Sequence, residues 1–240
     1  DGSDVARELY GTADEPTWPE RSSLQTLPLS TRNLVRAGGP VSSERDGTHQ
    51  GLFREHCVTC HALEGSGAGP ASVFQNPYPR DFRHGVFKWK STLRGLKPTR
   101  QDIRDLLVKG IPGTAMPSFA LLDPDDLDAL VDYVVYLSTR GEVERRMTAA
   151  AVDELDYGTE LPEAELRLAS KASTEGGEVV QQVVDRVHAG WAEAAENEVA
   201  APAMAELKSD ELADSVKRGK EFFHGRIANC VGCHGPGGDG

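Results

Sequence analysis

The sequence predicts a mainly α-helical chain, and two amphipathic segments support this prediction. Over about 123–139, apolar residues recur at the spacing of one buried helix face, and Pro124 lies in the first turn. Over about 177–198, valines and Trp191 form a second stripe with the same spacing. We expect each stripe to pack against another part of the chain.

Shorter helices are predicted from their end signals. Thr99 is the expected N-cap of a helix over about 100–109, with Asp102 at the capping-box position and Gly110 at the end. Ser209 is the expected N-cap of a further helix near the C-terminus.

Composition and periodicity divide the chain into four predicted parts. Residues 1–46 contain four prolines and no periodic pattern, so we expect an extension with little regular structure, anchored by Trp18. Residues 47–140 form the first domain, 141–208 an acidic helical linker, and 209–240 the N-terminal part of a second domain. The formal net charge of −12 argues against nucleic-acid binding.

All four cysteines lie in two Cys-x-x-Cys-His motifs, which are the most informative feature of the sequence. The motif residues are Cys57, Cys60 and His61 in the first copy and Cys230, Cys233 and His234 in the second. This spacing is typical of c-type haem attachment, in which two thiols bind the haem vinyl groups and the histidine binds iron. We therefore expect two covalently attached haem c groups.

Two other uses of a Cys-x-x-Cys pair fit less well. Zinc ribbons place their second pair roughly 15–20 residues after the first, and Cys60 and Cys230 lie much farther apart. A thioredoxin-like redox pair needs a βαβ context, whereas helix or loop is predicted before both motifs. Neither alternative explains the histidine that follows each pair.

Met116 is the candidate sixth ligand of the first iron. It lies in Gly110-Ile111-Pro112-Gly113-Thr114-Ala115-Met116-Pro117, whose glycines and prolines predict an ordered loop between two helices. Pro117 restricts the backbone at Met116. The alternative is that Met116 only fills space in the core.

Residues 47–140 resemble a class I cytochrome c domain. The resemblance rests on the Cys57-x-x-Cys60-His61 motif, the Gly67-Ala68-Gly69-Pro70 segment, the Ala115-Met116-Pro117 loop, and a closing helix with Tyr133 and Leu137. It implies helices around a covalently attached haem, with iron bound by His61 and Met116. It also implies that the carbonyl of Pro70 accepts a hydrogen bond from the His61 imidazole.

The second motif resembles only the opening of another such domain. A helix with Phe222 and Phe223 precedes Cys230, and a glycine-rich segment follows His234. The family domain would need roughly 50–70 further residues, in line with the usual size of small domains. His234 is the expected proximal ligand. The distal ligand stays open, with Met204, His188 and His224 as upstream candidates.

Residues 80–104 hold eight basic side chains against two acidic ones. Three interpretations stay open for this stretch: docking to an acidic partner, hydrogen bonding to haem propionates, or an ordinary solvated surface. Five nearby aromatic residues are expected to wall the haem pocket: Phe74, Tyr78, Phe82, Phe87 and Trp89.

These features predict a diheme electron carrier that exchanges single electrons with redox partner proteins. Haem c is attached outside the bacterial cytoplasm, so we expect a periplasmic or otherwise exported protein of a respiratory chain. No run approaches the roughly 20 apolar residues of a membrane-spanning helix. The protein would act either free or as the haem c subunit of an oxidase or dehydrogenase complex. The alternatives are a diheme peroxidase-like enzyme with an open second haem and a module that uses haem only structurally.

Overall fold

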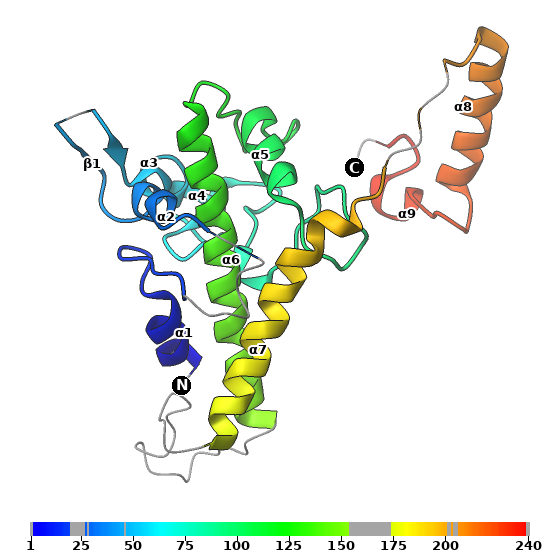
Figure 1. Cartoon of the computed structure of the whole chain (residues 1–240). Helices are drawn as coiled ribbons and strands as arrows, with labels where there is room; N and C mark the ends of the chain where they lie inside the picture. The colour runs from blue at the N-terminus through cyan, green and yellow to red at the C-terminus, as the bar shows by residue number, and fades with distance from the viewer. Residues whose placement is uncertain are drawn as a thin grey trace. The chain divides into compact units, whose positions relative to one another are not determined.

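A 30-residue helix, α6 (Pro124–Asp153), is the centre of the first of two units in the computed structural model (Figure 1). The structure describes residues 2–19, 27, 29–45, 47–153, 174–200, 203 and 206–238. The first unit is Asp1–Val199 and the second is Ala200–Gly240. The mainly helical prediction is confirmed.

Helix α6 is longer than predicted. The sequence suggested an end before Gly141, but the helix continues because Val143, Met147 and Ala150 are buried against neighbouring helices. Gly141 allows Arg83 to approach α6 closely, since a Cβ atom at this position would lie 2.5 Å from the Arg83 side chain. The predicted domain boundary at 140 therefore falls inside a continuous helix.

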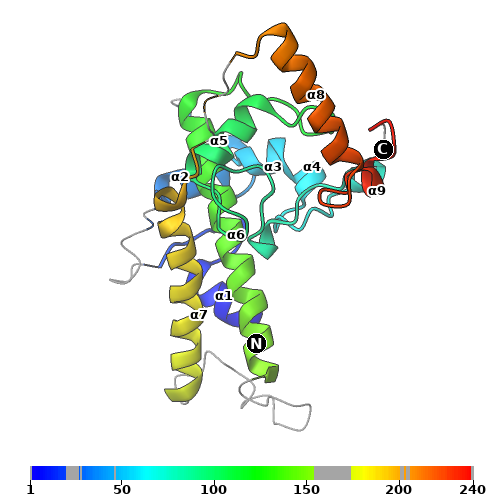
Figure 2. The ribbon, with the colours of Figure 1, turned by 90° about the vertical axis from the view of Figure 1, so that its right-hand side faces the viewer.

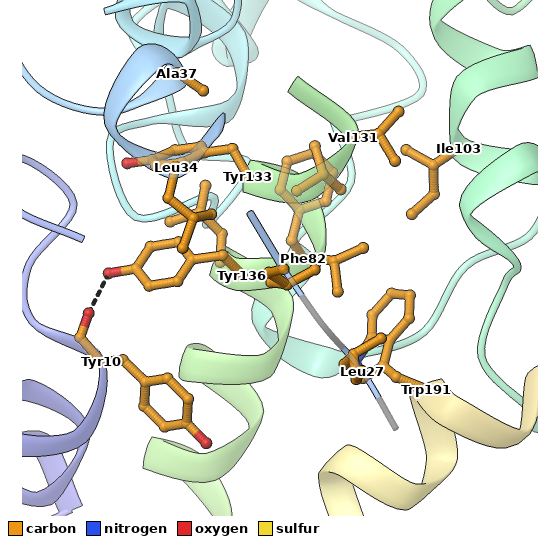
Figure 3. Packing of buried hydrophobic residues seen from close by; sticks show 14 of the residues in the cluster. Tyr10, Leu27, Leu34, Ala37, Phe82, Ile103, Val131, Tyr133, Tyr136 and Trp191 are labelled. Atoms are coloured by element: carbon orange, nitrogen blue, oxygen red, sulfur yellow. Dashed lines mark hydrogen bonds between the residues drawn. The ribbon is translucent and has the colours of Figure 1, made fainter. Parts of the chain in front are cut away.

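The N-terminal extension contains more regular structure than predicted. It forms α1 (Gly2–Tyr10) and α2 (Thr31–Ala37), both packed against α6. The Tyr136 hydroxyl donates to the backbone carbonyl of Tyr10 at 2.8 Å (Figure 3). It also contacts the carbonyl of Thr12 at 2.9 Å. Specific tertiary contacts thus hold this segment against α6.

A small hairpin connects the extension to the first motif. Strand β1 (Ser42–Ser43) pairs antiparallel with β2 (His49–Gln50). Gly51, with φ of 77°, then turns the chain into α3 (Leu52–His56). The side chains of Leu52 and Phe53 are buried, and the Phe53 ring lies 5.1 Å from that of Tyr133. Helix α3 is thereby fixed against α6.

Helix α5 (Arg100–Lys109) forms as the capping signals predict. The Thr99 hydroxyl accepts from the Asp102 amide at 3.0 Å, and the Asp102 carboxylate accepts from the Thr99 amide at 2.8 Å. Ile103 and Leu107 are buried, and Gly110 is the C-cap.

The second amphipathic stripe packs as predicted, but not in a separate linker. Helix α7 (Thr174–Ala192) lies along α6, as both views show (Figures 1 and 2). Val184, Val187 and Trp191 are buried, and the short helix η4 (Glu193–Asn197) follows. The expected linker over 141–208 is therefore corrected: α7 and the extended part of α6 belong to the first unit.

The second unit contains α8 (Ser209–His224) and α9 (Val231–His234). Lys208, not Ser209, is the N-cap residue of α8. The Glu211 carboxylate accepts from the Lys208 amide at 3.0 Å, and this bond fixes the helix start one residue earlier than predicted. Within the described ranges, no helix combines the length and apolar character that a membrane crossing requires.

Candidate haem-binding site

One helical turn brings together the cysteines and histidine of the first motif. Cys57 ends α3 and caps α4 (Val58–His61), and its carbonyl accepts from the amides of Cys60 at 3.1 Å and His61 at 2.8 Å. Both cysteines are free thiols. Burial, with a smaller contribution from Cys60, raises the pKa of Cys57 to about 12. A redox dithiol needs a lowered thiol pKa, so the environment of Cys57 argues against that chemistry.

The imidazole of His61 is buried and held in one orientation. Its Nδ1 donates to the backbone carbonyl of Arg80 at 3.1 Å, and its ring stacks on Phe82 with 4.5 Å between centroids. Burial lowers the pKa of His61, and the bond to Arg80 partly opposes this effect. The neutral ring with its proton on Nδ1 leaves the Nε2 lone pair for a metal, the usual arrangement of a ligating histidine.

The Gly69-Pro70 segment packs against α4 but does not hold the histidine as the resemblance implied. A Cβ atom on Gly69 would lie 2.5 Å from the carbonyl oxygens of Val58 and Thr59, so this close approach requires glycine. The Gly69 amide donates to the Cys60 carbonyl at 3.1 Å. The expected role of Pro70 is corrected, because the acceptor at His61 Nδ1 is Arg80.

Met116 lies in an ordered loop that follows α5. Its carbonyl accepts from the Ile111 amide at 3.1 Å, and its own amide donates to the Thr114 hydroxyl at 3.2 Å. Gly110 has φ of 65°, and a Cβ atom there would lie 2.8 Å from the Met116 carbonyl. The Met116 side chain is half-buried and packs against the cluster that includes Cys57. Its role as iron ligand stays a prediction.

Much of the basic stretch is engaged within the protein. Arg83 forms a two-point hydrogen bond with the Asp81 carboxylate, at 3.0 and 2.9 Å. Lys97 is buried, forms an ion pair with Glu142 and donates to the Gly85 carbonyl. The open surface of this stretch is thus smaller than the sequence suggested.

The aromatic wall is also smaller than expected. Phe82 and Phe87 are buried, but three of the five predicted residues are largely exposed: Phe74, Tyr78 and Trp89. The solvent-shielded aromatic surface beside His61 therefore consists of Phe82 and Phe87, which stack with centroids 6.1 Å apart.

The second motif repeats the local geometry of the first in a more open setting. The Cys230 carbonyl accepts from the amides of Cys233 at 3.2 Å and His234 at 2.9 Å. Cys233 and His234 are exposed. The same turn therefore brings two thiols and an imidazole together, as in the first motif.

The predicted distal candidates for this second haem have different placements. Both ring nitrogens of His224 lie within hydrogen-bond distance of backbone carbonyls, those of Lys220 and Pro236. His188 belongs to the first unit, where its Nε2 forms a 2.7 Å hydrogen bond with the Tyr10 hydroxyl. Met204 lies outside the described residues.

The sequence did not indicate that the Arg80 carbonyl would contact His61. It did predict Phe82 in the pocket wall, but not its stacking on the His61 ring. A backbone carbonyl leaves no residue-type signal. In the sequence, the only indication of these contacts was that the basic and aromatic stretch follows closely after the first motif.

The turn geometry, the free thiols and the neutral buried histidine are the features that covalent haem attachment requires. Residues 50–138 match the family model described as Cytochrome c. This match supports a c-type cytochrome domain in that part of the chain.

No curated protein matches the sequence. A solved structure titled Kuenenia stuttgartiensis reducing HAO-like protein complex Kustc0457/Kustc0458 is similar, with 21% identity and a TM-score of 0.49. The alignment covers 79% of this chain and 63% of that one.

Proposed function

We propose that this protein is a diheme c-type cytochrome that relays single electrons between redox partner proteins. The observation that supports this proposal best is His61, a buried neutral imidazole with Nδ1 hydrogen-bonded and Nε2 available beside two free thiols. The match of residues 50–138 to the cytochrome c family supports the same conclusion.

At the first site, Cys57 and Cys60 would bind the haem vinyl groups, and His61 and Met116 would bind the iron. Haem c bound there supplies a reversible one-electron Fe(III)/Fe(II) couple. The buried rings of Phe82 and Phe87 shield the His61 imidazole from water, which would tune such a couple. Two strong axial ligands leave no position for a substrate, so we assign electron transfer and no catalysis to this site.

At the second site, Cys230, Cys233 and His234 would attach another haem through the same turn. We infer that the protein acts outside the bacterial cytoplasm, because haem c is attached there, and that it serves a respiratory chain. It would work free or as the haem c subunit of an oxidoreductase complex. Exposed Lys88 and Arg94 are available for electrostatic docking of an acidic partner.

Haem stoichiometry tests the diheme proposal. Expressed with a haem c maturation system, the full chain should gain the mass of two haem groups in denaturing mass spectrometry. Replacing Cys230 and Cys233 by Ser should remove one haem, and replacing Cys57 and Cys60 should remove the other. A wild-type chain with one haem would contradict the proposal. Cyanide binding by the second haem would favour the diheme peroxidase-like enzyme instead.

A further inference from the structure

A buried phenol and a buried imidazole face each other outside the residues that match the family model. Tyr10 of α1 is 0% exposed, and His188 of α7 is 1% exposed. The Tyr10 hydroxyl lies 2.7 Å from Nε2 of His188. Both residues lie outside 50–138, so this contact belongs to the helices that the chain adds to the matched domain.

The indole of Trp18 packs against both members of this pair. The centroid of its ring lies 4.8 Å from that of His188 and 5.7 Å from that of Tyr10. Trp18 is only partly buried, so it connects the enclosed pair with the surface. Tyrosine and tryptophan are the aromatic side chains that lose one electron most readily, and histidine takes up a proton near neutral pH. The three rings therefore combine two electron donors with one proton acceptor.

A series of rings connects this cluster with the helix that precedes the first motif. The Phe53 ring of α3 lies 5.1 Å from that of Tyr133, and the Tyr133 ring lies 5.3 Å from that of Tyr136. The Tyr136 hydroxyl donates to the backbone carbonyl of Tyr10 at 2.8 Å, as Figure 3 shows. Close contacts thus lead from Tyr10 across α6 to α3, which ends at Cys57.

We propose that Tyr10 and His188 form a redox-active pair, in which the phenol is oxidised while its proton stays inside the protein. A diffusing oxygen-centred radical takes one electron from Trp18, and Tyr10 then supplies an electron to the oxidised indole. The phenolic proton moves along the 2.7 Å hydrogen bond to His188 Nε2. The products are a neutral tyrosyl radical, an imidazolium, a restored indole and the reduced oxidant.

The geometry of the pair suits this transfer. A proton passes directly between heavy atoms that lie roughly 2.6–3.2 Å apart. An oxidised phenol is a strong acid and must release its proton, and burial keeps bulk water away from this one. His188 accepts the proton at Nε2 when its own proton is on Nδ1. Burial also protects the radical from reaction with solutes.

One further electron returns the pair to its starting state. The electron reduces the tyrosyl radical, and His188 gives the proton back to the phenolate oxygen. The ring series through Tyr136 and Tyr133 leads this electron from the one-electron carrier at the first site. This last step rests on the proposed function, whereas the oxidation of Tyr10 does not.

Freeze-quench paramagnetic resonance on the full, oxidised chain tests the proposal. A light flash on tris(bipyridine)ruthenium with persulfate supplies the one-electron oxidant. The wild type should give a tyrosyl radical whose signal narrows when ring-deuterated tyrosine is incorporated. Tyr10→Phe should lose most of this signal. Tyr78→Phe, at a position 66% exposed, is the matched control and should keep it.

His188→Gln separates proton transfer from simple hydrogen bonding. A glutamine side chain can accept a hydrogen bond from the phenol but is too weak a base to take up its proton. We expect a clear loss of radical yield in His188→Gln, and slower radical formation by the wild type in deuterium oxide. If Tyr10→Phe does not fold, 3-fluorotyrosine at position 10 should change the splitting of the signal.

Separate outcomes bear on the inference and on the proposed function. A tyrosyl signal that survives Tyr10→Phe, or a full yield in His188→Gln, would overturn the redox role of the pair and leave electron transfer by haem intact. A chain without a reversible haem couple that still forms the Tyr10 radical would overturn the proposed function alone.

Discussion

Two tyrosine hydroxyls of α6 hold the N-terminal segment in place. Tyr133 donates to the carbonyl of Ala13 at 2.5 Å, and Tyr136 donates to that of Tyr10 at 2.8 Å. Burial raises the pKa of both phenols above the ordinary value of 10.0. The unfolded chain therefore ionises first as the pH rises, so the contribution of these tyrosines to stability is complete below about pH 10 and is lost above it.

We predict that Tyr136→Phe destabilises the first unit at pH 7 by about 1–3 kcal/mol, because buried carbonyls lose their donor. The substitution should also reduce the loss of folding stability that the wild-type chain shows between about pH 9 and pH 11, around the ordinary phenol pKa of about 10. Urea unfolding followed by tryptophan fluorescence measures both effects, since all three tryptophans belong to the first unit. Tyr78→Phe, at a position 66% exposed, is the control and should change neither. If Tyr136→Phe loses as much stability between about pH 9 and pH 11 as the wild type, the stabilising role of the Tyr136 hydroxyl would be contradicted.

Single residues also show where prediction from sequence fails. Lys97 belongs to a basic stretch whose ordinary interpretation is an exposed surface, but it lies buried between Glu142 and Trp191. Burial lowers the pKa of Lys97, and the adjacent Glu142 carboxylate opposes this effect. Lysine is rarely buried without a partner, and the partner here lies on a helix distant in sequence. Local composition could not reveal it.

Among the helices, those with strong local end signals were predicted best. The Thr99–Asp102 capping box defines the start of α5, and Gly110 defines its end. The end of α6 was predicted incorrectly, because Gly141 looks like a terminator in sequence but serves the close approach of Arg83. Helix α1 was missed although Val5, Ala6 and Tyr10 recur at helical spacing and are buried, because the pattern extends over only nine residues.

The cap of α5 permits a quantitative prediction. Thr99→Ala should lower the free energy of unfolding by about 1 kcal/mol, because the Asp102 amide loses its acceptor. Gln101→Ala, in the same first turn, is the control and should cost no more than about 0.5 kcal/mol, since it removes only a pair with Asp105. Chemical unfolding of the first unit measures both. Equal effects of the two substitutions would contradict a specific capping role.

At the scale of the whole molecule, the family match and the folded unit have different extents. Residues 50–138 match cytochrome c, whereas the first unit is Asp1–Val199. The additional helices α1 and α7 pack on the extended α6, and α7 reaches the haem site through Trp191 and Phe87. The motifs alone indicated the thiols and histidines. The support of His61 depends on tertiary contacts that only the structure reveals.

The most direct measurement is a potentiometric titration of the first haem with and without Met116→His. The full chain with Cys230→Ser and Cys233→Ser leaves one haem to observe. We predict one reversible one-electron couple, whose potential falls in Met116→His because bis-histidine ligation gives a lower potential than histidine–methionine ligation. Absence of a reversible couple, or a potential that does not respond to this substitution, would contradict an electron-transfer haem bound by His61 and Met116.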